Sequence, residues 1–259
     1  MVTDAMVSAD ALWQLIRGES EVAASDPPLR GSSAAILGHP DLGHAVAFVI
    51  GQRLGTGNDR RALLTRIASE AFHAEPDLVE AATRDLQGII RRDPATRGFL
   101  PPLLNFKGYV ALQAWRVSHW LWCRGRTDLA LLMQSQSSER LQVSIHPSAS
   151  IGTSVFLDHA TGIIVGAFAS IGDEVTMLQN VTIGRQQADP DAAPRIGRGV
   201  FIGAGATIIG DVSVGDFAKI GAGSVVLADV PPGCTAVGVT ARLTNCPDVS
   251  RTTPSLRGA

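Results

Sequence analysis

The sequence lacks the features that mark several large classes of protein. Its 259 residues carry a formal net charge of −2 and no long basic run, so we expect neither nucleic acid nor an anionic membrane as a partner. No apolar run approaches the roughly 18 residues of a membrane span. The N-terminus has no basic segment followed by an apolar stretch, so we expect no signal peptide.

Cysteine and aromatic residues are also scarce. The three cysteines, Cys123, Cys234 and Cys246, are odd in number and widely spaced, which predicts neither a zinc site nor a disulfide framework. We therefore expect a reduced, cytoplasmic protein without a bound metal. Aromatic residues make up only 5% of the chain, but 45% of it is hydrophobic, which is enough for a substantial core.

From Ile145 to about Val230 the chain repeats every six residues. Gly often follows the repeated aliphatic residue, and a small or branched residue stands four positions after it. Such a short period predicts a solenoid, with the aliphatic side chains pointing inward and Gly adopting corner dihedral angles that other residues resist. The aliphatic residues stand at 145, 151, 157 and 163, at 165, 171, 177 and 183, and at 196, 202, 208, 214, 220 and 226.

The chain before this repeat has apolar residues at helical spacing, and composition changes abruptly at Val143. We expect a helical domain over residues 1–140, a solenoid over 141–232 and a tail over 233–259 without periodicity. Thr127 or Asp128 is the expected N-cap of the last helix. The predicted helices are Ala9–Arg17, Asp59–Phe72, Pro76–Arg91, Lys107–Arg124 and Asp128–Glu139.

A polar segment with two prolines, residues 185–195, interrupts the six-residue period. Loops that leave a regular scaffold often carry function, although a tolerated surface insertion would look the same. Three six-residue sides make one coil of a triangular solenoid, so this loop separates two predicted coils on each side. Those coils are residues 145–163, 165–183, 196–213 and 214–231.

Several stretches resemble the serine acetyltransferases, the CoA-dependent enzymes of cysteine biosynthesis. They include RRDPA at 91–95, KG at 107–108, IHP at 145–147, LDHATG at 157–162 and KIGAGSVVL at 219–227. The repeat alone indicates only an acyltransferase scaffold, whereas LDHATG together with RRDPA is far more specific. The resemblance implies a left-handed parallel β-helix that forms a homotrimer, or a dimer of trimers paired through the N-terminal helices. It also implies acetyl-CoA in a groove between neighbouring β-helices.

The resemblance makes His159 the expected general base, because neutral imidazole can take a proton from an acceptor near pH 7. A lone histidine is more often structural, so this expectation depends on the LDHATG match. The resemblance also implies that Asp93 and Asp158 hold the ammonium group of an amino-acid acceptor. For Asp93 there is a plain alternative, since Asp followed by Pro is a good helix N-cap.

The resemblance implies that the pantetheine arm of CoA lies close to the backbone at small residues. It also implies that a lysine contacts a phosphate of CoA. The same small residues are also explained by solenoid geometry alone, and the glycines at 203 and 205 are not read as a dinucleotide-binding turn. The expected CoA-binding residues are Gly184, Ala204, Gly205, Lys219 and Ala222.

The chain departs from the family pattern at the catalytic position before IHP. The family has Asp there, which orients the imidazole, and this chain has Ser144. Serine can accept the imidazole N–H but carries no charge to stabilise an imidazolium, and loss of such a carboxylate slows a serine-protease triad about 10⁴-fold. We therefore expect Ser144 to act as a weaker orienting residue.

Two further departures concern the acceptor and a partner. The family has an Arg-His pair that helps to bind the carboxylate of serine, and this chain has Ala192 and Ala193. Arg185 is the expected replacement cation, with Arg195 as the other candidate. The sequence ends in Gly258-Ala259 without the terminal Ile that docks the family enzyme into cysteine synthase, so we do not expect that partnership.

The sequence thus predicts an acetyl-CoA-dependent acetyltransferase acting on a small amino- or hydroxyl-bearing metabolite other than serine. One alternative is an ordinary L-serine O-acetyltransferase. Another is a catalytically silent scaffold, which the retention of Asp93, Asp158 and His159 argues against. A longer acyl-CoA or a sugar acceptor is the remaining alternative.

Overall fold

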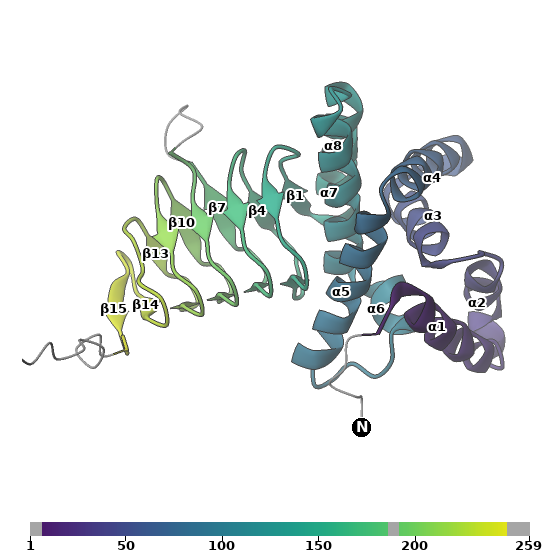
Figure 1. Ribbon diagram of the computed structural model, residues 1–259, viewed down its shortest axis with the longest axis horizontal. Helices are drawn as coiled ribbons and strands as arrows, with labels where there is room; N and C mark the ends of the chain where they lie inside the picture. Colours follow the sequence, from purple (N-terminus) through teal and green to yellow (C-terminus); the bar gives the residue numbers. More distant parts are fainter. Residues whose placement is uncertain (1–6, 186–191, 248–259) are drawn as a thin grey trace, which may run out of the picture.

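A computed structural model describes residues 7–185 and 192–247. It has a helical N-terminal part lying beside a solenoid of short strands, and α7 and α8 meet the first strand (Figure 1). The helices are α1 (Ala9–Ala23), α2 (Arg30–Leu37), α3 (Leu42–Leu54), α4 (Gly57–Ala74), α5 (Pro76–Arg92), α6 (Leu100–Asn105), α7 (Lys107–Cys123) and α8 (Thr127–Leu141), with a short 3₁₀ turn at Pro27–Leu29.

Helices α2, α3 and α6 were not predicted. In α3 buried residues lie on nearly every side, so no polar face marks a helical period. In α6 two prolines occupy the first turn, where proline is tolerated. The predicted N-cap of α8 is wrong, because the helix begins at Thr127 and Arg126 stands at the N-cap without a side-chain hydrogen bond.

The strands form three parallel sheets that run along the solenoid, in the orders β1-β4-β7-β10-β13, β2-β5-β8-β11 and β3-β6-β9-β12-β14. The strands are β1 (Val143–Ile145), β2 (Ser150–Ile151), β3 (Phe156–Leu157), β4 (Ile163–Val165), β5 (Ser170–Ile171), β6 (Thr176–Met177), β7 (Thr182–Gly184), β8 (Arg195–Ile196), β9 (Phe201–Ile202), β10 (Thr207–Ile209), β11 (Ser213–Val214), β12 (Lys219–Ile220), β13 (Val225–Val226), β14 (Thr235–Val237) and β15 (Arg242–Thr244).

Register shows where the regular coil is stretched. In the last coil Thr207 pairs with Val225, a step of 18 residues. In the first coil Val143 pairs with Ile163, a step of 20 residues. The two additional residues lie between β3 and β4, in the LDHATG segment. The repeated aliphatic side chains point inward, and most are almost completely buried.

We expected the glycines of the repeat to adopt corner dihedral angles, but the structure gives a different reason for them. Gly203 and Gly215 do not have a positive φ. Instead, a Cβ on Gly203 would lie 2.6 Å from the backbone nitrogen of Ala222, and one on Gly215 would lie 2.4 Å from that of Pro232. Close stacking of successive coils therefore requires glycine at these positions. Several corner residues that do have a positive φ are not glycine, including Ser154 and Asn180.

The C-terminal part corrects two expectations. Strand β14 continues the β3 sheet past Pro232, and β15 pairs with it in antiparallel orientation. This hairpin brings Cys246 next to Cys234, and the two are joined in a disulfide with a Cα–Cα distance of 4.1 Å. The prediction of no disulfide was wrong because the hairpin was not predicted. Cys123 is free, and the residues after 247 lie outside the described part.

No helix within the described part of the chain combines the length and apolarity needed to cross a bilayer.

Candidate active site

The turns that connect the β3 sheet to the β1 sheet stack into one edge of the solenoid, here called the β3/β4 edge: residues 158–162, 178–181, 203–206 and 221–224. Backbone hydrogen bonds join each turn to the next. Asn180 N donates to Thr161 O at 2.7 Å, Gly205 N to Gln179 O at 2.9 Å, and Gly223 N to Ala204 O at 2.8 Å. The structure thus brings five predicted site residues to one edge: Asp158, His159, Ala204, Gly205 and Ala222.

His159 lies in the longest of these turns. His159 and Ala160 both have left-handed backbone conformations, with φ of 55° and 58°. The side chain of His159 is 72% exposed, and its Nε2 lies 3.8 Å from Asp158 Oδ1. This distance is within ion-pair range but too long for a hydrogen bond. Non-glycine residues in the left-handed region often occur at functional sites.

Ser144 lies in β1, opposite Ile164 of β4. Its Oγ accepts a hydrogen bond from Nε2 of Gln134 in α8 at 3.2 Å. The polar neighbour that the structure gives to His159 is Asp158, whereas Ser144 is engaged by the helical domain. Sequence reasoning did not identify Gln134.

Gly184 and Arg185 lie on a different edge, where the β1 sheet turns toward the β2 sheet. The guanidinium of Arg185 lies 5.5 Å from the ring centre of Phe168. His146 is on the same edge, and its Nδ1 lies 2.8 Å from Ser148 Oγ. Burial, and secondly the charge of Arg185, lowers the pKa of His146. Within a single chain, Arg185 and His159 therefore lie on different edges of the solenoid.

The remaining predicted residues are dispersed. Lys219 is exposed on β12, between Phe201 and Thr235 of the neighbouring strands. Of the two alanines in the interrupting loop, Ala193 is buried against the solenoid. Just after it, Pro194 O accepts from Ser170 N at 3.0 Å, which returns the chain to the coil. Residues 186–191 of the predicted loop lie outside the described part.

Asp93 is the C-cap of α5. One of its carboxylate oxygens accepts from Ala95 N at 2.9 Å, and the other accepts from the hydroxyl of Thr96. The alternative role as a helix N-cap is therefore wrong, because the segment after Pro94 is a turn. Asp93 is half-buried, and its carboxylate is held by hydrogen bonds from that turn.

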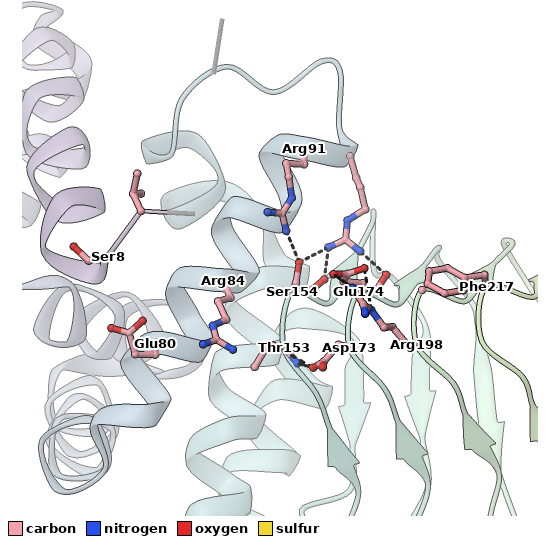
Figure 2. Close-up of a pocket in the computed structure, with 13 residues that line it drawn as sticks. Ser8, Glu80, Arg84, Arg91, Thr153, Ser154, Asp173, Glu174, Arg198 and Phe217 are labelled. Atoms are coloured by element: carbon pink, nitrogen blue, oxygen red, sulfur yellow. Dashed lines mark hydrogen bonds and ion pairs between the residues drawn. The ribbon is translucent and has the colours of Figure 1, made fainter. Parts of the chain in front are cut away.

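Arg92, directly before Asp93, fixes the end of α5 to the solenoid. Its guanidinium donates to Ser154 O, and to Glu174 O at 2.7 Å, so one side chain holds two successive coils. Burial is the main cause that lowers the pKa of Arg92, to about 10. A cleft of about 890 Å³ lies beside it, between α5 and the successive turns that join the β2 sheet to the β3 sheet (Figure 2). The cleft is lined by arginines and carboxylates of both α5 and the solenoid, including Arg84 and Arg198.

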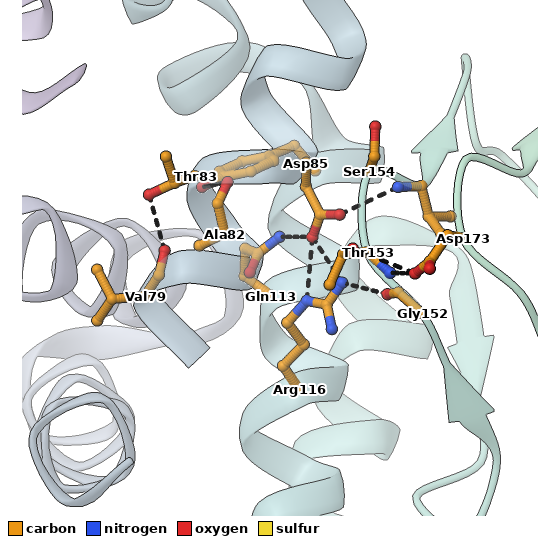
Figure 3. Close-up of polar contacts among 12 residues, drawn as sticks. Val79, Ala82, Thr83, Asp85, Gln113, Arg116, Gly152, Thr153, Ser154 and Asp173 are labelled. Atoms are coloured by element: carbon orange, nitrogen blue, oxygen red, sulfur yellow. Dashed lines mark hydrogen bonds and ion pairs between the residues drawn. The ribbon is translucent and has the colours of Figure 1, made fainter. Parts of the chain in front are cut away.

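A buried ion pair lies behind this cleft (Figure 3). Asp85 of α5 and Arg116 of α7 are 2.8 Å apart, and their side chains are 0% and 6% exposed. Asp85 also accepts from Val155 N at 3.0 Å, and Arg116 donates to Gly152 O at 2.7 Å. Two helices and the first coil are thereby joined by one polar network. Sequence reasoning missed it, since Asp85 sits in an ordinary helical pattern.

Both parts of this chain are similar to known proteins. A family model described as "Serine acetyltransferase, N-terminal" matches residues 12–114, and "Bacterial transferase hexapeptide (six repeats)" matches residues 193–228. The serine acetyltransferase of Salmonella typhimurium is 44% identical over 241 residues, which is 92% of this chain and 88% of the relative. This chain belongs to the serine acetyltransferase family.

Solved structures of the family have the same fold. Soybean serine acetyltransferase complexed with serine matches with a TM-score of 0.88 and 43% identity, covering 93% of this chain and all of that one. The Brucella abortus serine acetyltransferase in complex with coenzyme A matches with a TM-score of 0.87 and 42% identity, covering 90% and 95%. The predicted fold class is confirmed: a helical domain is followed by the left-handed parallel β-helix of the hexapeptide-repeat acyltransferases.

Within residues 7–185 and 192–247, no group of three His, Cys, Asp or Glu side chains is placed to hold a metal ion.

Proposed function

We propose that this protein transfers the acetyl group of acetyl-CoA to the hydroxyl of L-serine, with His159 as general base. The observation that carries the proposal is the exposed His159 beside Asp158 in the extended turn of the β3/β4 edge. The family membership favours serine over the changed acceptor that Ala192 and Ala193 led us to expect, since identity reaches 44% over 92% of the chain. The soybean relative was solved with serine and the Brucella relative with coenzyme A.

The residues along the β3/β4 edge fit an extended pantetheine arm. The backbone is accessible at Gly205 and Gly223. Among the described residues, leaving out chain neighbours, the nearest atoms to a Cβ built on Gly205 are 4.0 Å away, and none lies within 4 Å of one built on Gly223. Ala204 and Ala222 next to them add only a methyl group. A linear amide-bearing chain can approach such a surface closely and exchange hydrogen bonds with it. Lys219, exposed on the adjoining strand, would meet a phosphate of CoA.

In the proposed reaction the imidazole of His159 removes the proton of the serine hydroxyl as its oxygen attacks the thioester carbonyl. The C–S bond then breaks, the acetyl group stays on the serine oxygen, and the imidazolium returns its proton to the departing thiolate. Asp158 stabilises the imidazolium electrostatically. The ammonium group of serine would pair with Asp158 and Asp93, the two carboxylates that the resemblance assigns to it.

The proposed site is complete only between copies of the chain. His159 lies on the β3/β4 edge, whereas Arg185 and Gly184 lie on another edge of the same solenoid. In a homotrimer, or a dimer of trimers, an edge of one copy would face a different edge of the next. Exposed apolar side chains on the solenoid, such as Ile164 and Phe201, at 48% and 43% exposure, support such an association.

The experiment is release of free thiol from acetyl-CoA, measured with L-serine and with a panel of homoserine, simple amines and hydrazines. The proposal expects L-serine to give the highest kcat/KM and O-acetylserine as product. Turnover with an amine but not with serine would instead support a changed acceptor. No turnover and no CoA binding would support a silent scaffold.

A further inference from the structure

The N-terminus of helix α7 is docked directly on the turn that carries His159. Lys107 is the first residue of this helix, and its ammonium donates a hydrogen bond to the Thr161 hydroxyl. Both side chains are half-buried. The contact joins residues 54 positions apart, so it ties the helical domain to the turn between β3 and β4.

The next residue of the helix contacts the other end of the same turn. A Cβ built on Gly108 would lie 2.0 Å from the carbonyl oxygen of Leu157 and 2.9 Å from its Cβ. The backbone of α7 therefore packs on the residue that precedes Asp158, and only glycine permits that approach. The turn is thus held at Leu157 by packing and at Thr161 by a charge-assisted hydrogen bond.

Beside these two anchors backbone hydrogen bonds also shape the turn, with Asp158 N donating to Met177 O at 2.8 Å and Gly162 N to Gln142 O at 2.8 Å. These bonds involve main-chain atoms and not the imidazole itself. The His159 side chain is 72% exposed, so packing does not set its orientation. Its direction follows from the left-handed backbone at His159 and Ala160. That conformation is unfavourable for residues with a side chain and persists only where the surroundings impose it.

We propose that Lys107 is a positioning residue for the acetyl transfer: through Thr161 it holds the 158–161 turn in the conformation that presents His159 to the acceptor. This inference rests on the proposed function of His159. Lysine is rare in this chain, at residues 107 and 219 only, against twenty arginines. A compact ammonium suits a single hydroxyl acceptor, whereas the broad planar fork of arginine suits a bidentate one.

The test is a double-mutant cycle of Lys107→Met and Thr161→Val. Each single variant should lower kcat about 10- to 100-fold, since small misplacement of a catalytic group has costs of this order. The KM for acetyl-CoA should stay within about twofold. The double variant should be no slower than the slower single variant, because both changes break the same contact. Thr161→Ser, which keeps the hydroxyl, and Arg124→Met, which removes an exposed charge at the far end of α7, should keep the wild-type kcat.

Hydrogen exchange gives a second readout that does not depend on turnover. In Lys107→Met the amides of residues 159–162 should exchange faster, while the melting temperature and exchange in the strands stay unchanged. If the wild-type protein did not acetylate serine, the proposed function would fail, yet exchange would still report whether Lys107 orders this turn. The inference is overturned by a wild-type kcat in Lys107→Met, by independent effects that multiply in the double variant, or by unchanged exchange at 159–162.

Discussion

At the scale of single residues, the proposed reaction depends on one imidazole, whose position is set by its backbone. The side chain of His159 is 72% exposed and lies near the carboxylate of Asp158. The two side chains are 72% and 32% exposed, so solvent screens their mutual attraction, which contributes roughly 0–1 kcal/mol to stability. We therefore expect changes at His159 to affect the rate and not the fold.

Replacing His159 by Ala or by Asn should lower kcat by about 10² to 10⁴, the range that general base catalysis contributes. The melting temperature should remain within about 1 °C of wild type, since the side chain is exposed. Thiol release under saturating acetyl-CoA measures kcat, and thermal unfolding measures the melting temperature. Full activity in His159→Ala would remove the general-base assignment.

His146 should make the free energy of unfolding depend on pH. Burial, and then Arg185, lowers the pKa of His146 from its usual 6.5. Between 6.5 and that lowered value, the unfolded chain binds a proton that the folded protein does not bind. The free energy of unfolding should therefore fall as the pH drops below about 6.5. In His146→Gln the loss between pH 7 and pH 5 should be shallower, with the remainder coming in part from His39, whose pKa is also lowered by burial. Equal slopes for both proteins, measured by urea unfolding, would contradict this.

At the scale of elements, the strands were predictable and the connections were not. The six-residue period predicts inward side chains wherever a coil repeats, and strands β1 to β13 follow it. The hairpin of β14 and β15 breaks that period, so neither it nor the Cys234–Cys246 disulfide was visible in the sequence. Helix α3 was missed because burial on nearly all sides leaves no amphipathic pattern.

The sequence motifs predicted some residues of the site, but the contacts that support those residues were not predictable. LDHATG pointed to His159 and Asp158, and the structure places both on the edge that also holds Ala204 and Ala222. The helix-to-solenoid contacts were not predictable, since Asp85, Arg92 and Lys107 look like ordinary helical residues until the coils are packed against them. Contacts across 54 to 84 residues leave no periodic signal.

The buried pair of Asp85 and Arg116 should be the most sensitive of these contacts. Asp85→Asn leaves a guanidinium buried without its carboxylate and should lower the free energy of unfolding by about 3–5 kcal/mol. The exposed pair of Arg126 and Glu70 is the matched control, with side chains 36% and 49% exposed. Arg126→Gln should cost less than about 1 kcal/mol. Denaturant unfolding measures both, and equal losses would show that the buried network does not hold the two parts together.

At the scale of the whole molecule, the helical domain supports the first coil, and the residues of the proposed site are divided between two edges of the solenoid. If the site is completed between copies, the protein in solution should have a mass three or six times 27.1 kDa. Light scattering after gel filtration measures this. A fully active species of 27.1 kDa would contradict the shared site.

The most direct test concerns the acceptor itself, because this chain has Ala192 and Ala193 where the resemblance implies an Arg-His pair for the serine carboxylate. The measurement is kcat/KM for thiol release from acetyl-CoA with L-serine, compared with the same rate for homoserine, amines and hydrazines. L-serine should be the best acceptor, and His159→Ala should lower its turnover by about 10² to 10⁴. A hydrazine or amine that reacts more efficiently than L-serine would contradict the proposed function.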